Sequence, residues 1–380
     1  MNITEISSKA CTGCALCSVI CPKFAITMVA DEEGFLYPKC NDELCINCGI
    51  CLHKCPSRVE LQVENTSEIY EAKAKDRLIR ESSTSGGIFS LMAQNILKSQ
   101  GCVYGAGFEN DSYRVVHKRV DDLNGLRALN DSKYVQSNIE SVFIPLKKDL
   151  EAGKKVLFSG TPCQIHAISE FVKKSTFAEN LFLCDIVCHG CPSPEIYEKH
   201  LAFLEKKYEM KIKSVKFRDK EYGWSKSCQR ILKVVSRKGD VFQDTSYYKL
   251  YFSYGVLSRP VCEQCRYCTP NRVSDITLGD FWGNHDLEND ELGISLIMVN
   301  TDKGKRMMKE IRESMFLSES NINIASKENI HLRLPVVFGS WRNSFWSAYQ
   351  RLGYEKTLKI FTDQNIVFRL MRKMIVHFWK

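Results

Sequence analysis

Two runs of cysteine with one shared spacing constrain this chain more than any other feature. In each run, gaps of two, two and three residues separate four cysteines, and a proline follows the last of them. The first run contains Cys11, Cys14, Cys17 and Cys21, and the second contains Cys45, Cys48, Cys51 and Cys55. This spacing is the ligand pattern of bacterial ferredoxins, and two copies of it predict two [4Fe–4S] clusters.

The fourth cysteine of each run is expected to bind the cluster of the other run. Cluster one then takes Cys11, Cys14, Cys17 and Cys55, and cluster two takes Cys45, Cys48, Cys51 and Cys21. A zinc site usually combines two separated pairs of cysteines, and a disulfide framework is typical of secreted chains. The doubled pattern favours a ferredoxin over both alternatives. Electron transfer is therefore the first function that we predict.

The rest of the chain is long enough to bury a large core. Residues 1–62 complete the two-cluster domain, whereas the chain has 380 residues, of which 44% are hydrophobic, a share typical of globular proteins. No apolar run is long enough to cross a membrane, so we expect no transmembrane segment. The first residues lack the basic and apolar regions of a signal peptide. We therefore expect a cytoplasmic protein with reduced cysteines.

Charge is unevenly distributed along the chain. The formal net charge is +8, although acidic residues outnumber basic ones in the two-cluster domain. A basic body suits an anionic cofactor or substrate, and we expect no nucleic-acid partner because no recognition motif for one occurs. The tail over residues 331–380 is basic and contains aromatic residues. Such a tail is typically an amphipathic helix that packs on its own protein, and the alternative is peripheral contact with a membrane surface.

Seven further cysteines lie near three loops. They are Cys163, then Cys184, Cys188 and Cys191, then Cys262, Cys265 and Cys268. Cys163 is expected at a helix start, where amides and the helix dipole stabilise a thiolate, and Cys188 is expected at the end of a buried strand. Together these cysteines could supply a third cluster. The alternatives are scattered structural cysteines, or a zinc knuckle at the last loop.

Two polar segments could contact a cofactor. The loop 83–87 is rich in serine and glycine and opens a helix, where a phosphate group could bind. The segment 133–137 offers a cation, an aromatic ring and an amide. The simpler interpretations are an ordinary helix start and an ordinary strand edge.

Six segments occur in an order that resembles the beta subunit of coenzyme F420 hydrogenase and dehydrogenase, here fused to a two-cluster ferredoxin domain. They are residues 83–87, 133–137, 159–164, 188–194, 259–265 and 274–283. The resemblance implies FAD and a third [4Fe–4S] cluster with Cys163, Cys188, Cys262 and Cys265 as ligands. Cys191 stands where the family more often has an apolar residue. The flavin-site residues that the resemblance implies are Ser85, Gly86, Gly87, Lys133, Tyr134 and Gln136.

The fold class that we predict is α+β, with a ferredoxin-like two-cluster domain first. The strand and helix signals that alternate after it indicate an α/β domain. The two-cluster domain is thus followed by a larger α/β flavin and iron–sulfur domain. Its N-terminal part is expected over residues 63–160 and its C-terminal part, with the third cluster, over residues 161–330. Residues 331–380 form the basic tail.

The resemblance implies an iron–sulfur flavoprotein oxidoreductase. Electrons would pass between the clusters and FAD, and a hydride would be exchanged with F420 or another anionic substrate. A redox partner protein or a ferredoxin is then expected at the acidic two-cluster domain. The alternative is an electron-transfer subunit without its own substrate, which serves a partner oxidoreductase or a polysaccharide-biosynthesis enzyme. The sequence leaves the catalytic residues, the donor, the acceptor and the oligomeric state open.

Overall fold

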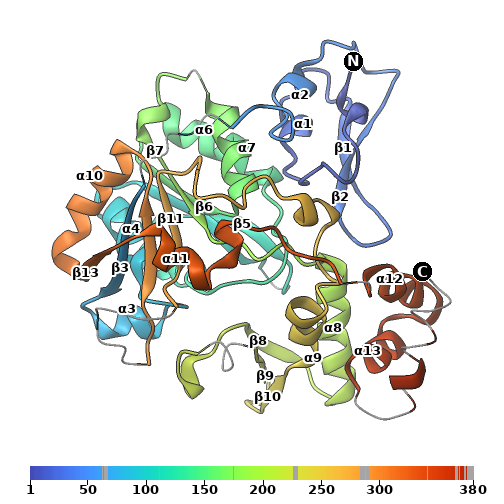
Figure 1. The fold of residues 1–380 in the computed structure, drawn as a ribbon. Coiled ribbons are helices and arrows are strands. Elements are labelled where there is room, and N and C mark those ends of the chain that lie inside the picture. Colours follow the sequence, from blue (N-terminus) through green and yellow to red (C-terminus); the bar gives the residue numbers. More distant parts are fainter. Residues whose placement is uncertain are drawn as a thin grey trace.

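A computed structural model gives the fold (Figure 1). It describes the chain except for residues 62, 111, 174, 340 and 368 and the stretches 64–66, 226–229, 283–286, 288–290, 364–366, 372–373 and 375–380. Position 62, at the expected domain boundary, lies outside the described residues. So do Gly283, at the end of the sixth family segment, and much of the tail after position 363.

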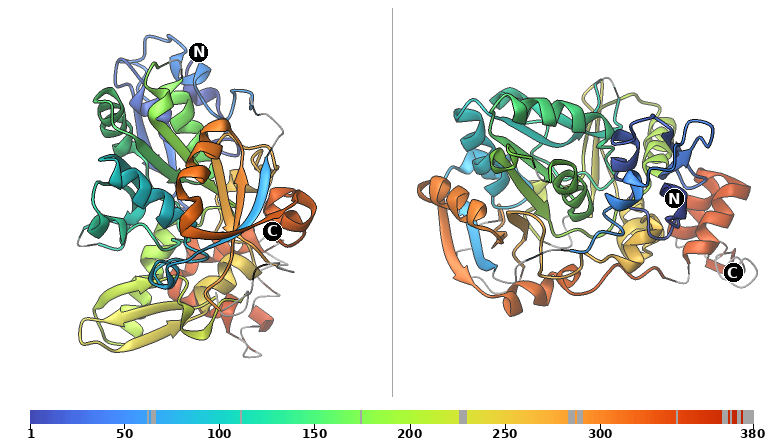
Figure 2. Two further views of the ribbon diagram at one scale, coloured as in Figure 1. Left: turned by 90° about the vertical axis from the view of Figure 1, so that its left-hand side faces the viewer. Right: turned by 90° about the horizontal axis from the view of Figure 1, so that it is seen from above.

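The N-terminal lobe is built from the short helix η1 (Ile3–Glu5), two further short helices and one hairpin. Strands β1 (Ile26–Ala30) and β2 (Leu36–Cys40) pair antiparallel, and helices α1 (Leu16–Val19) and α2 (Ile50–His53) each carry one cysteine. Its small core joins apolar side chains to those two cysteines. Figures 1 and 2 show this lobe at one end of the molecule, beside helix α7 (Pro162–Val172).

An eight-stranded mixed sheet forms the centre of the molecule, with the order β13-β3-β12-β11-β7-β6-β4-β5. The strands are β3 (Glu68–Ala74), β4 (Cys102–Phe108), β5 (Val115–Val120), β6 (Val156–Gly160), β7 (Leu181–Ile186), β11 (Ile276–Asp280), β12 (Ser295–Val299) and β13 (Met315–Ser320). The four strands β4, β6, β7 and β11 run parallel. Their carboxyl ends therefore share one edge, where α/β sheets commonly bind ligands.

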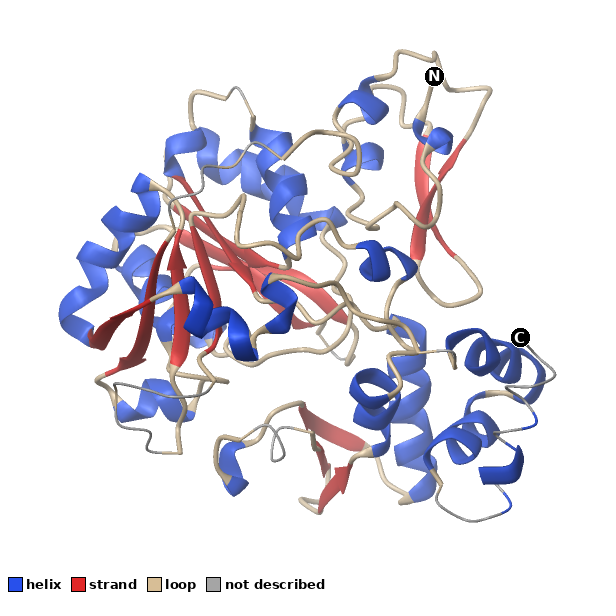
Figure 3. Ribbon diagram, viewed as in Figure 1, coloured by secondary structure: helices blue, strands red, loops and turns tan. Residues whose placement is uncertain are grey.

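Successive side chains of the parallel strands point to opposite faces of the sheet, so a core forms on each face. In β6, Leu157 packs on one face, while Val156 and Phe158 pack on the other. The first face is covered by α4 (Ile88–Lys98), α5 (Leu123–Leu126) and α10 (Asp302–Ile311), and the second by α6 (Phe143–Glu151) and α7. Figure 3 shows these helices outside the sheet. Short helices α3 (Arg77–Glu81) and α11 (Ile322–Glu328) complete this domain.

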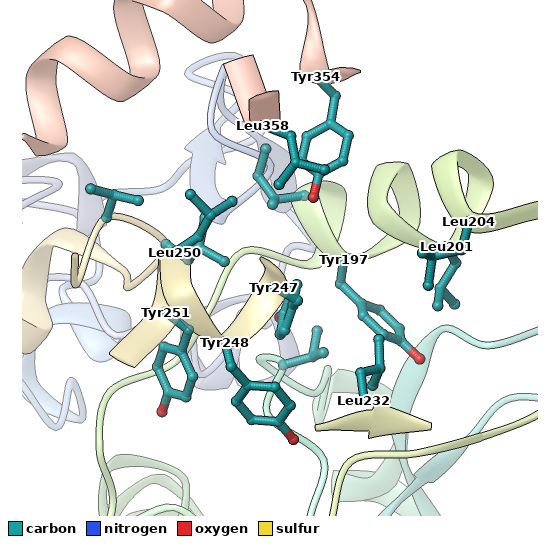
Figure 4. Close-up of a cluster of buried hydrophobic side chains, with 14 of the residues drawn as sticks. Tyr197, Leu201, Leu204, Leu232, Tyr247, Tyr248, Leu250, Tyr251, Tyr354 and Leu358 are labelled. Carbon is teal, nitrogen blue, oxygen red and sulfur yellow. The ribbon is translucent and has the colours of Figure 1, made fainter. Parts of the chain in front are cut away.

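A third lobe has its own aromatic core. The three-stranded sheet of β8 (Ile212–Lys216), β9 (Leu232–Ser236) and β10 (Val241–Asp244) lies against the helices α8 (Pro194–Lys207), α9 (Ser246–Tyr248), α12 (Arg342–Leu352) and α13 (Tyr354–Thr362). Figure 4 shows Tyr197, Tyr247 and Tyr354 meeting there with Leu201 and Leu358. The first half of the basic tail thus forms packed helices. None of the helices in the described part of the chain has the length and apolar character needed to cross a membrane.

Candidate iron–sulfur and cofactor sites

The two cysteine runs fold in the same way. In both, the residues before and after the second cysteine have positive φ: Gly13 and Ala15 in the first run, and Asn47 and Gly49 in the second. This curls the backbone and turns successive amides toward one side, as in anion-binding nests. The Gly13 amide, for example, donates to the Cys11 sulfur at 3.4 Å. The curl brings the first three thiols of each run to a common side.

The thiols expected around cluster one face one another. Burial raises the pKa of Cys14 to about 12, and the charges of Cys55 and Cys11 act in the same direction. Burial likewise raises the pKa of Cys17, and the charges of Cys14, Cys11 and Cys55 add to this shift. Buried thiols whose pKa is raised in this way need a cationic group, such as iron, to be stable as thiolates.

The thiols expected around cluster two line a separate cavity. Its walls include Cys21, Cys45, Cys48 and Cys51, together with Met1 and Ile46. The structure therefore places the fourth cysteine of each run with the first three cysteines of the other. Cys48 is exposed, so this cavity lies at the surface of the lobe.

A third cavity holds the cysteines from the three later loops. Cys163, Cys188, Cys262 and Cys265 line it, and Cys191 and Cys268 lie in the same wall. Cys184 is not among its lining residues, because this cysteine lies in β7 and packs into the core. All the described cysteines are free thiols.

The fold explains how these loops meet. Cys163 follows Pro162 at the start of α7, where Thr161 and Gln164 form a reciprocal cap. Cys188 follows β7 at the shared edge of the sheet. Cys262 and Cys265 come from the short helix η6 (Pro260–Gln264) and the residue after it.

The third cavity lies between the two-cluster lobe and a larger cleft. On one side its wall includes Lys9, Thr12 and Ser57 of the lobe. On the other side it shares Cys188, Gly190 and Cys191 with the cleft. The three cysteine groups and the cleft thus follow one another through the molecule.

The cleft opens at the carboxyl ends of the parallel strands. Among the residues expected to contact flavin, Ser85, Gly87, Lys133 and Tyr134 line it. Gly86 and Gln136 are not among the lining residues. The Gly86 amide donates to Ser295 Oγ at 3.0 Å, and a Cβ on Gly86 would lie 2.4 Å from the Ala72 carbonyl oxygen.

Gln136 points toward the two-cluster lobe. Its Nε2 donates to the Thr12 carbonyl oxygen at 2.9 Å, and its Oε1 accepts from Arg259. Lys133 lines the cleft, whereas Gln136, three residues later, contacts the two-cluster lobe. The Gln136 side chain therefore links the lobe to the body of the protein.

Two cations line the cleft, Arg218 beside Asp280 and Lys133 near Asp131. Arg218 Nη1 pairs with Asp280 Oδ2 at 2.8 Å, whereas its Nε and Nη2 are buried without a hydrogen bond to any described residue. Burial lowers the pKa of Lys133 to about 8, with Asp131 partly opposing this shift. Buried, incompletely paired N–H groups favour an anionic ligand. Sequence reasoning missed Arg218, since it lies in a separate lobe.

A neutral histidine forms part of the cleft wall. Burial lowers the pKa of His117 to about 4. Its Nε2 faces the Ser159 carbonyl oxygen at 2.9 Å and therefore carries the hydrogen, while its Nδ1 accepts from Ser137 Oγ at 3.0 Å. Gln164 Nε2 donates to the same hydroxyl at 3.0 Å. This network connects the cleft wall to the helix start that carries Cys163.

The described part of the chain contains no group of three or more His, Cys, Asp or Glu side chains that could hold a single metal ion. The zinc alternative would need such a group. Thiolates around a [4Fe–4S] cluster do not meet at one ion, because each binds a different iron atom. The cysteines at two of these sites line cavities, which is the arrangement that a cluster requires.

Two family models match the chain. Residues 10–59 match the 4Fe-4S dicluster domain, and residues 153–324 match the C terminus of the coenzyme F420 hydrogenase/dehydrogenase beta subunit. Residues 153–324 belong to this beta-subunit family. The predicted family is therefore confirmed, and so is the fold class of a two-cluster ferredoxin-like domain followed by a larger mixed α/β domain.

A solved structure is also similar to the chain. It is a chain of the xenon-derivatised F420-reducing [NiFe] hydrogenase complex from Methanosarcina barkeri, with 14% identity and a TM-score of 0.49. The similarity covers 72% of this chain and 90% of that chain. No curated protein matches the sequence. The beta-subunit match includes the third cavity's cysteines, whereas the segments around Ser85 and Lys133 lie before it.

Proposed function

We propose that the chain is an iron–sulfur flavoprotein oxidoreductase that passes electrons between its ferredoxin-type clusters and FAD, with hydride exchange to F420 or another anionic substrate. One observation carries the proposal: the third cysteine cavity borders the two-cluster lobe on one side and the cleft on the other. Such an order gives electrons a continuous route between the lobe and the cleft. A protein that only stored iron would not need that route.

The third cluster is proposed for the cavity with Cys163, Cys188, Cys262 and Cys265. Four thiols from three loops suit the four iron atoms of a cubane cluster. Cys191 contacts Cys188 and Cys262, and Cys268 contacts Cys265. These two extra thiols lie close enough to donate hydrogen bonds to ligand sulfurs, which is one way in which proteins raise a cluster's potential.

FAD is proposed for the cleft. The unpaired N–H groups of Arg218, the Lys133 ammonium group and the Thr84 hydroxyl suit its diphosphate. FAD would supply the ability to exchange electrons singly with clusters and in pairs with a substrate. His117 is held neutral and fixed by three hydrogen bonds of its network, so it keeps the wall rigid without adding charge. The same cations favour a substrate that carries phosphate or carboxylate groups.

Anaerobic purification with iron, sulfide and flavin counted per chain tests this function. We expect about twelve iron atoms, from three clusters of four, and about one FAD per chain. About eight iron atoms without flavin would overturn the oxidoreductase proposal. The chain would then be a two-cluster electron-transfer subunit that serves a partner enzyme.

A further inference from the structure

Arg259 is a buried arginine that reaches from the body into the two-cluster lobe. It directly precedes the helix η6, which carries Cys262, and only 1% of its surface is exposed. Its Nε donates to the Cys11 carbonyl oxygen at 2.8 Å, and its Nη2 donates to the Leu36 carbonyl oxygen at 2.9 Å. These two bonds fix both the cysteine run and the hairpin of the lobe against the loop of the third cavity.

The lobe is shaped to receive this side chain. The guanidinium carbon lies 4.2 Å from the centre of the Tyr37 ring and 5.4 Å from that of Phe35, distances typical of cation–π contacts. A Cβ on Gly13 would lie 2.5 Å from Arg259 Nη1. The glycine between Cys11 and Cys14 is thus needed for the approach of the guanidinium as well as for its positive φ.

The same guanidinium contacts a cluster ligand directly. Its Nη2 donates to the Cys11 sulfur at 3.7 Å. Arginine stays protonated at all accessible pH values. Reduction of a cluster adds one negative charge, which a nearby buried cation and an N–H···S hydrogen bond stabilise. Both effects make the cluster easier to reduce.

The charge of Arg259 is not cancelled by an ion pair. Within the described part of the chain, no carboxylate forms a salt bridge with it, and its partners are carbonyl oxygens, the Gln136 amide, a sulfur and two rings. Arg342 provides a contrast. It also joins the body to the lobe, but through a bidentate pair with the Glu33 carboxylate. Arg342 therefore fixes the lobe without adding net positive charge.

We propose that Arg259 is a positioning residue that raises the reduction potential of the cluster held by Cys11 and fixes that cluster beside the third cavity. The proposal rests on the proposed function only in that it requires this cluster to be present. It does not depend on FAD or on the identity of the substrate. Arg259 would make cluster one easier to reduce than it would be without this cation. Cluster one would then be favoured as the cluster that holds an electron next to the third cavity.

Redox titration of the full chain tests the proposal. Wild type and the variants R259Q, R259K and R342Q are purified anaerobically, iron and sulfide are counted, and each cluster's reduction is followed by electron paramagnetic resonance against the applied potential. In R259Q we expect unchanged iron and one midpoint shifted negative. A tenfold loss in the equilibrium constant for reduction corresponds to about 59 mV for one electron. R259K retains the charge and is expected to shift less, and R342Q is expected to keep the wild-type midpoints.

Three outcomes would overturn the proposal. The first is an unchanged set of midpoints in R259Q with full iron. The second is an equal shift in R342Q, which would assign the effect to docking of the lobe. The third is loss of iron in both R259Q and R259K, which would leave Arg259 a purely structural role. Absence of clusters from the wild type would instead count against the proposed function.

Discussion

At the scale of single residues, Cys163 and Cys184 separate a ligand role from a structural role. Cys163 lines the third cavity, whereas Cys184 is buried in β7 and packs into the core. We expect C163A to lose about four iron atoms per chain, the content of one cluster, and to slow the reduction of bound flavin by electrons from the lobe. C184A should keep its iron, although it removes a thiol of the same kind. Iron and flavin analysis of both variants checks this.

Full iron in C163A, with flavin reduced at the wild-type rate, would remove this residue from the route. Equal iron loss in C184A would show that the effect comes from a weakened core. Comparison of C163A with C184A therefore distinguishes loss of a cluster ligand from loss of core packing.

Lys133 should make the proposed FAD binding in the cleft sensitive to pH. Burial lowers its pKa to about 8, so its positive charge is lost as the pH rises from 7 to 9, and an anion is then bound less tightly. We expect FAD affinity, measured by fluorescence quenching in flavin-depleted protein, to fall by about tenfold over this range, the worth of one hydrogen bond to a charged group. K133R keeps its charge and should bind FAD with little dependence on pH. The same pH dependence in both proteins would exclude Lys133 as the titrating group.

At the scale of elements, the start of α7 links the cleft wall to the third cavity. Gln164 accepts from the Thr161 amide and donates to Ser137, so its side chain satisfies the helix start and the histidine network together. We expect Q164A to lower the free energy of unfolding by about 1–3 kcal/mol, the cost of leaving buried polar groups unpaired. S169A, on the same helix but away from its start, serves as the control. Chemical denaturation of the two variants measures the difference.

Iron retention gives a second measurement for that helix. If Gln164 positions Cys163, Q164A should also release iron faster than S169A when a chelator is added. Equal stability and equal iron release in the two variants would show that the cap does not support the cavity.

The sequence predicts the local elements but not the contacts between elements that are far apart in the chain. The apolar runs before Ser159 and Val187 predict buried strands, and the loops after them meet because parallel strands end at one edge. The positions of Gln136 and Arg218 could not be predicted in this way. Gln136 turns to the lobe because Thr12 and Arg259 are there, and Arg218 reaches the cleft from a separate sheet. Such contacts join segments far apart in sequence, which local pattern does not specify.

At the scale of the whole molecule, the outermost cysteine cavity lies beside an exposed apolar surface. Ile46, which lines the cavity with Cys48, is 58% exposed. Leu44 and Ile50 directly adjoin the lining residues Cys45 and Gly49 in sequence and are 50% and 42% exposed. Exposed apolar side chains that gather at one site often mark a contact with another protein, and the neighbouring Asp42 and Glu43 would favour a partner with a basic rim. Electrons that travel through all three cysteine groups would enter or leave here.

We therefore expect I46K to slow reduction by a ferredoxin by about tenfold, because the lysine places a charge in the apolar contact and costs it on the order of 1.4 kcal/mol. Reduction by dithionite, which needs no docking surface, should keep its rate. V241K changes an equally exposed side chain on the distant three-stranded sheet and should leave both rates unchanged. Stopped-flow absorbance gives all three rates. If I46K slows dithionite as much as ferredoxin, the substitution has damaged the cluster; if it slows neither, the partner contacts the molecule elsewhere, and the order of the cavities does not set where electrons enter.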